Sequence, residues 1–307
     1  MQLEINKNTI LLYALLNRFD QALGDANTTE LRSEMVEYFK DYSGTTPVVG
    51  EYIHTSKCFF WCVSVSEVPK FEPKKLELNR KQQFEFNSGK KIKPYLLEFY
   101  ENSKFEEYYI QLLPELKKIY AEFREEFKEG DFKNLLETIW EVKSDSRMVV
   151  ILNPFTQSSF GPKIGGTNYQ MLGMWGDRKL SSYSHNIIHE GSHPYAKEVL
   201  KPFLNEIENI APILEKAYKD PNYPKSYRNW STCFEEHLIR AVHGGLINPK
   251  IKKEYNLEKN LNFERDRKGM IFIHEFYEIL KDSDSVATAT PRIIEYLKKK
   301  CQSNNLL

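Results

Sequence analysis

The sequence predicts an α+β protein that is predominantly α-helical and carries a small β-sheet. Most of the chain repeats apolar residues at the spacing of amphipathic helices. Two segments differ: Arg147–Leu152 is β-rich and ends at Asn153-Pro154, and Asn168–Gly173 alternates in character. The predicted organisation is a mainly helical N-terminal region, residues 1–145, followed by a region with the strands, residues 146–307.

The N-terminal region contains several helix signals. Apolar spacing predicts a helix over residues 8–22, with Asn8 as its cap. Asn27–Glu30 and Ser103–Glu106 both resemble capping boxes that open further helices. Phe59–Val65 fits either a strand or a buried helix. Residues 67–92 are rich in Lys, Pro and Asn and predict a loop.

The second region returns to helical patterns after the two strands. Apolar residues at helical spacing predict helices over residues 198–219 and 227–244, and helical structure within 257–282 and 291–301. No internal repeat is visible in the chain. A further helix is predicted around residues 187–193, where the chemistry of the sequence is concentrated.

Composition excludes some function classes. The 307 residues include 43 basic and 43 acidic ones, and this zero net charge gives no sign of a nucleic-acid or anionic-membrane surface. No apolar run is long enough to span a bilayer and no signal peptide opens the chain, so we expect a cytoplasmic protein. A secreted form trimmed of its signal would look the same. The four cysteines lack a Cys-x-x-Cys pair, which favours free thiols over a structural zinc site.

The most informative stretch is His189-Glu190-Gly191-Ser192-His193. On a helix, positions i and i+4 lie on one face, so His189 and His193 can present two imidazole nitrogens to one metal ion. Glu190 can then serve as the general base that activates a water molecule. A chance match is the alternative, but the chain has only 7 histidines. The spacing therefore predicts a zinc site.

A catalytic zinc site commonly has three protein ligands and an open position. The helix predicted over residues 227–244 offers two adjacent candidates for the third ligand, Glu235 and Glu236. Glu236 shares a helix face with Arg240 and His243, whereas Glu235 lies at the edge of the apolar face. Geometry alone does not choose between the two glutamates.

These motifs resemble the gluzincin pattern of thermolysin-like and aminopeptidase-like zinc metallopeptidases. More closely, they resemble an uncharacterised bacterial family of predicted gluzincins, in which His-Glu-x-Ser-His-Pro precedes Glu-x-Leu-(Ile/Val)-Arg-Ala. Here the motifs are His189–Pro194 and Glu236–Ala241. The resemblance covers about residues 147–245. It implies a zincin-like core with the sheet beside the motif helix, His189, His193 and Glu236 as ligands, and Glu190 as base.

One position departs from the thermolysin-like pattern, because the residue four after Glu236 is Arg240 and not an acid. Arg240 is a candidate for binding a substrate carboxylate or for a structural ion pair with Glu236. His243, Tyr227 and Tyr169 are candidates for the donor that stabilises a developing oxyanion. A structural role is the alternative for each of them.

The function predicted from these residues is that of a zinc-dependent metallopeptidase acting on a peptide or protein substrate. We expect the substrate to lie extended along Asn168–Gly173, as an added strand on a free sheet edge. A zinc hydrolase of a non-peptide amide or ester is an alternative, as is a catalytically idle binding protein that keeps the zinc fold. The intact Glu190 argues against an idle protein, and His237 is predicted to lie at the surface. The sequence leaves the oligomeric state open.

Overall fold

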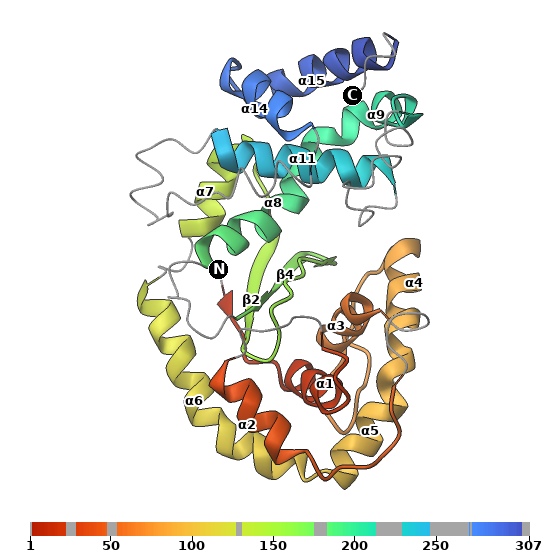
Figure 1. Cartoon of the computed structure of the whole chain (residues 1–307), viewed down its shortest axis with the longest axis vertical. Coiled ribbons are helices and arrows are strands. Elements are labelled where there is room, and N and C mark those ends of the chain that lie inside the picture. Colours follow the sequence, from red (N-terminus) through yellow and green to blue (C-terminus); the bar gives the residue numbers. More distant parts are fainter. Residues whose placement is uncertain are drawn as a thin grey trace. The chain divides into compact units, whose positions relative to one another are not determined.

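The chain forms two compact units in a computed structural model (Figure 1). The first unit comprises Met1–Glu129 and Ser146–Leu180, and the second comprises Gly130–Asp145 and Ser181–Leu307. The predicted boundary after residue 145 differs from this division, because the strands belong to the first unit and Gly130–Asp145 to the second. The structure describes residues 2–22, 29–47, 54–126, 131–174, 183–212, 229–245, 270 and 272–302.

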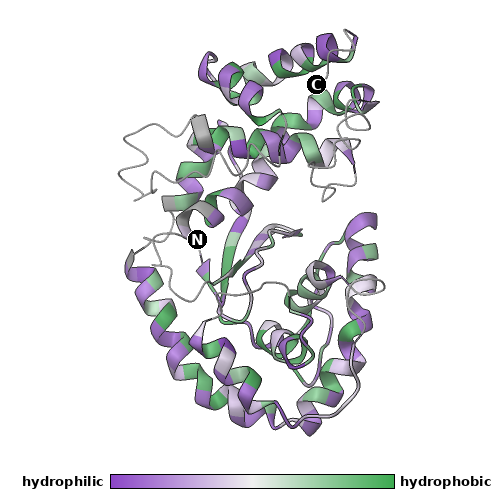
Figure 2. Cartoon of the chain, in the orientation of Figure 1, coloured by the Kyte–Doolittle hydropathy of each residue, from purple (hydrophilic) through white to green (hydrophobic). Residues whose placement is uncertain are grey.

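The helices of the first unit are arranged around a core rich in aromatic residues. The rings of Phe39 and Phe99 have centroids 5.0 Å apart, and Tyr108 lies 4.9 Å from Phe39. In Figure 2 hydrophilic and hydrophobic residues alternate along α6, as expected for a helix with one buried face. The helical elements are α1 (Lys7–Arg18), α2 (Glu30–Tyr38), α3 (Thr55–Val63), α4 (Arg80–Gly89), the 3-10 helix η1 (Lys90–Ile92), α5 (Lys93–Asn102) and α6 (Phe105–Glu126).

The capping residues correct several predicted helix starts. Asn6, not Asn8, caps α1, because its side chain accepts a hydrogen bond from the backbone of Thr9. Thr29 caps α2 in the same way, and residues 27 and 28 lie outside the described residues. Ser103 ends α5 and does not open α6. Asn6 and Thr29 have the extended backbone conformation that an N-cap requires.

Two other segments of the first unit were ambiguous or mispredicted. The stretch that fitted a strand or a helix is helical, in α3, whose residues from Cys58 to Val63 are buried. Residues 67–92 are not all loop, because they contain α4, which starts with a capping box between Asn79 and Gln82. The Lys-, Pro- and Asn-rich composition of residues 67–92 gave no indication of this helix.

The sheet has four strands: β1 (Gln2–Leu3), β2 (Arg147–Asn153), β3 (Lys163–Ile164) and β4 (Thr167–Gly173). Their order is β1-β2-β4-β3, with β3 antiparallel to β4 and the other pairs parallel. Residues of β2 and β4 such as Val149, Ile151 and Met171 belong to the same core cluster as the helices of this unit. The need to cover this apolar sheet face explains why the strands group with the first unit.

Strand β4 is central, so the prediction of a free edge at Asn168–Gly173 is wrong. It pairs with β2 along its whole length and with β3 through Asn168 and Thr167. Beyond β3, Met171 and Phe160 exchange backbone hydrogen bonds of 2.9 and 3.0 Å. All seven residues of β4 are buried. The strand therefore has neighbours on both sides and offers no backbone edge to a peptide.

The second unit is helical throughout its described residues. Helix α11 packs against α8 and α14, α7 packs against α8, and α14 packs against α15. The sheet and the helix with the His-Glu-x-x-His motif thus belong to different units, and the zincin-like core stays a prediction. The elements are α7 (Asp131–Trp140), α8 (Ser184–Leu200), the 3-10 helix η3 (Lys201–Phe203), α9 (Leu204–Asn209), α11 (Trp230–Gly245), α14 (Ile273–Lys281) and α15 (Val286–Gln302).

Three predicted helical ranges of the second unit are only partly described. The helix expected over residues 198–219 is divided among the end of α8, η3 and α9, and residues 213–219 lie outside the described residues. Residues 227 and 228, and most of 257–272, are outside them too. Among the described helices, none combines the length and apolar character needed to cross a membrane.

Candidate metal centre

Helix α8 places the two motif histidines one turn apart. Ile187 and Ile188 are buried and fix one side of the helix in the core. His189 and His193 are half-buried, with 13% and 16% of their side chains exposed, and their ring centroids are 5.3 Å apart. The spacing in the sequence therefore produces the paired imidazoles that it predicts.

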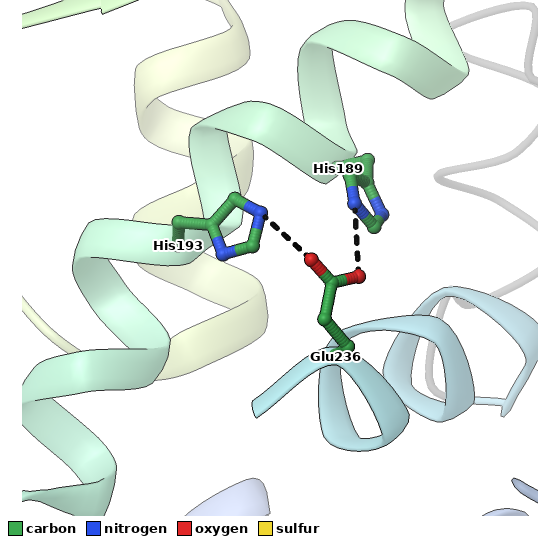
Figure 3. A group of neighbouring side chains, drawn as sticks. All are labelled: His189, His193 and Glu236. Carbon is green, nitrogen blue, oxygen red and sulfur yellow. Dashed lines mark ion pairs between the residues drawn. The ribbon is translucent and has the colours of Figure 1, made fainter. Parts of the chain in front are cut away.

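Helix α11 brings Glu236 to these histidines (Figure 3). The Nε2 atom of His189 lies 3.4 Å from Oε2 of Glu236, and Nε2 of His193 lies 3.6 Å from Oε1. One ligand atom from each of the three residues lies within 4.8 Å of the others. In Figure 3 both imidazole rings point from α8 toward the carboxylate on α11.

The donor set and its spacing fit a zinc ion. Ligand atoms at about 2.1 Å from a tetrahedral zinc ion are separated by about 3.4 Å. Each imidazole lies near this distance from one oxygen of Glu236, although from different oxygens, and one ligand atom from each residue lies within 4.8 Å of the others. Two imidazoles and one glutamate also form one of the common donor sets of catalytic zinc sites. The Oε2 atom of Glu236 is buried, and among the described residues it has ion-pair contacts with His189 and Arg240 but no hydrogen bond. A buried carboxylate oxygen normally has a partner, and a cation between the three residues would supply it.

The electrostatics keep Glu236 ionised. Burial raises the pKa of its carboxyl, but the two histidines and Arg240 outweigh burial and lower that pKa to about 2. Arg240 contributes through its Nε atom, 3.5 Å from Oε2 of Glu236. A metal ligand must be deprotonated, so Glu236 is in the state required for binding.

Glu235 and Glu236 differ in their contacts although they are adjacent. The Nδ1 atom of His193 lies 2.7 Å from Oε1 of Glu235, so this hydrogen bond is on the ring nitrogen that does not face Glu236. The Nζ atom of Lys197 lies 3.7 Å from the same oxygen. Glu236, and not Glu235, is the glutamate that joins the two histidines in the cluster.

A second chain of contacts ends at His243. The indole Nε1–H of Trp140 donates to Oγ of Ser192 at 2.9 Å, and that oxygen lies 3.3 Å from Nε2 of His243. The rings of His243 and His189 have centroids 5.7 Å apart. His243 is fully buried. A fully buried ring is poorly placed to contact a substrate, which disfavours the oxyanion role expected from the sequence.

The remaining candidates are distributed as follows. Glu190 follows His189 in α8, is half-buried, and has no hydrogen bond or ion pair with any residue that the structure describes. Arg240 has 21% of its side chain exposed beside Glu236. Tyr169 belongs to the first unit, where it is buried in β4 and burial raises its pKa. Tyr227 lies outside the described residues.

The prediction that His237 lies at the surface is wrong. Its side chain is fully buried, because both α8 and α14 pack against α11. Its Nδ1 contacts the backbone oxygen of Cys233 at 2.7 Å, and the backbone N–H of Phe272 donates to its Nε2 at 3.4 Å. Burial lowers the pKa of His237 to about 4, so the ring is neutral and structural.

Sequence reasoning missed the contacts of Glu235, Ser192 and Trp140. Trp140 lies 52 positions before Ser192, and no pattern in the sequence connects them. No family model, curated protein or solved structure matches the chain. The geometry of His189, His193 and Glu236 is therefore the main support for a function, together with the motif.

Proposed function

We propose that this chain is a zinc-dependent hydrolase of amide or ester bonds, with its active site at His189, His193 and Glu236. The observation that carries the proposal is the convergence of these three residues from two helices of the second unit. Three protein ligands leave an open coordination position, which is the pattern of catalytic zinc sites and not of structural ones. The resemblance to gluzincins supports the same assignment.

Glu190 is the proposed general base. A bound zinc ion supplies Lewis acidity, which polarises the substrate carbonyl and makes water more acidic. The carboxylate of Glu190 takes a proton from the attacking water and delivers it to the leaving amine or alcohol. Glu190 follows His189 in the chain and forms no hydrogen bond or ion pair with a described residue, which leaves its carboxylate available for this transfer.

Arg240 is proposed to support Glu236. Its guanidinium lies one turn after Glu236 and approaches Oε2, so it helps to hold the ligand carboxylate in its charged form. This contact favours the ion-pair role over substrate binding. His243 is proposed to pack behind His189 as a structural residue.

The central position of β4 changes the expected substrate. An extended peptide binding to a free strand edge at Asn168–Gly173 was the argument for a peptidase, and this edge is occupied by β3 and Phe160. A small amide or ester therefore moves ahead of an extended peptide. A peptidase remains the second candidate, supported by the motifs and by their resemblance to gluzincins.

The test is hydrolysis of a mixed panel of peptides, small amides and small esters by zinc-loaded protein. We expect turnover of small amides or esters that a chelator abolishes and added zinc restores. Turnover confined to peptides would favour the peptidase. Zinc binding without turnover of any compound in a broad panel would favour the idle binding protein.

A further inference from the structure

Glu235 is not one of the three residues whose ligand atoms converge, yet it is almost as buried as Glu236. Its side chain is 11% exposed, and its closest polar contact is the Nδ1 atom of His193 at 2.7 Å. This distance is short for a nitrogen-to-oxygen hydrogen bond, as expected when the acceptor is a carboxylate. The contact joins α11 to α8 at the ring that also faces Glu236.

The hydrogen bond determines which nitrogen of His193 is free. A carboxylate can only accept, so Nδ1 of His193 must carry the proton. In the neutral ring the lone pair then lies on Nε2, the nitrogen that is 3.6 Å from Glu236. A metal ligand needs that lone pair at Nε2, so Glu235 selects the tautomer and the ring orientation that suit binding.

The two histidines differ in this respect. Among the described residues, the only carboxylate within ion-pair distance of His189 is Glu236 itself. His193 has Glu235 on one ring nitrogen and Glu236 on the other. Glu235 therefore contacts only one of the two histidines, and the site is asymmetric.

We propose that Glu235 is a positioning residue that orients His193 and strengthens metal binding without being a ligand. This inference rests on the proposed zinc site but makes a separate claim about it. It differs from the expectation from the sequence, in which Glu235 was only an alternative to Glu236 as the third ligand. The Nζ atom of Lys197 lies 3.7 Å from Oε1 of Glu235, so the two side chains form an ion pair.

The experiment measures zinc affinity by competition with a chromophoric chelator, for the wild type, Glu235→Ala and Glu235→Gln. Loss of an outer-shell partner weakens metal binding roughly 10- to 100-fold, and we expect this for Glu235→Ala. Glu235→Gln keeps an acceptor oxygen for Nδ1–H and should lose less. Glu198→Gln on the exposed side of α8, where Glu198 is 56% exposed, is the matched control and should bind like the wild type.

A second readout is the tautomer of His193 in metal-free protein, from nitrogen-15 chemical shifts of its ring. We expect protonation at Nδ1 in the wild type and a mixture of tautomers in Glu235→Ala. Unchanged zinc affinity in both Glu235 variants, alongside a wild type that binds zinc, would overturn this inference and leave the proposed function standing. A wild type that binds no zinc would overturn both.

Discussion

Buried polar side chains occur in both units, but they are satisfied in different ways. In the first unit, the amide of Asn8 donates to the backbone oxygens of Cys62 and Ser66, and its oxygen accepts from the backbone N–H of Val68. These contacts of 2.9 to 3.1 Å use its amide oxygen and both amide hydrogens. In the second unit, Glu236 is also buried, and its Oε2 has no hydrogen bond with any described residue.

The difference separates a polar group that is fully hydrogen-bonded within the protein from one that lies in a candidate metal site. Asn8 joins α1 to the segment that follows α3, and its contacts are complete within the protein. Glu236, His189 and His193 converge on one point, where Oε2 of Glu236 has ion-pair contacts but no hydrogen bond with a described residue. Burying a carboxylate is costly unless it is paired, so a bound cation would add to the pairing that His189 and Arg240 already give. We expect the two units to respond to substitution as differently as these contacts imply.

The largest effect is expected for Glu190→Gln. Removing a general base lowers the rate by roughly two to four orders of magnitude, while zinc affinity stays near that of the wild type. The measurement is kcat/KM on the best substrate of the panel, with zinc content determined on the same samples. A variant that keeps full activity would remove Glu190 from the proposed mechanism.

Glu236→Ala should lower zinc affinity by more than the roughly 100-fold upper range of outer-shell partners, because it removes a proposed ligand. Chelator competition on the metal-free protein gives the value. The free energy of unfolding without zinc should change less than in Asn8→Ala, since the imidazoles and the guanidinium left behind are partly exposed to water. If Glu236→Ala binds zinc normally and Glu235→Ala does not, the two glutamates have been assigned in the wrong order.

Asn8→Ala should show the opposite pattern. It leaves three buried backbone groups without their partner, and we expect the free energy of unfolding to fall by about 2 to 3 kcal/mol. Zinc affinity of the folded protein should not change, because Asn8 belongs to the first unit. Urea denaturation and chelator competition on the same sample check both statements. A parallel loss of zinc affinity would contradict the separation of roles.

The smallest effect is expected for Lys197→Met. The Lys197 side chain is 62% exposed, and exposed ion pairs contribute between zero and about 1 kcal/mol. Zinc affinity should therefore fall by no more than about fivefold. Lys201→Met, at the next turn and 74% exposed, is the control. A larger loss for Lys197→Met would mean that Glu235 depends on this lysine.

The sequence predicted the helical class, the two long strands and the two motif histidines on one helix face, because each follows from local spacing. Spacing did not choose between Glu235 and Glu236, and only the resemblance to gluzincins implied Glu236, the glutamate that the structure brings to His189 and His193. Whether β4 is an edge or a central strand depends on pairing with β3, which local alternation does not reveal. The burial of His237 depends on two other helices packing against α11.

The contacts of Glu235 illustrate the same limit. On the sequence it stands beside Glu236 and has the same chemistry, and a helical wheel could not choose between them. Only the placement of α8 against α11 brings Glu236 to Nε2 of His193 and Glu235 to Nδ1 of the same ring. Tertiary packing therefore distinguishes the proposed ligand from the residue that orients a ligand.

The most direct test of the central claim is a zinc titration of metal-free protein by isothermal calorimetry, with the double variant His189→Ala/His193→Ala as control. We predict about one zinc ion per chain for the wild type, as expected for a single three-ligand site, and no comparable binding for the variant. No zinc bound by the wild type, or equal binding by the variant, would contradict the claim that these residues form a metal site.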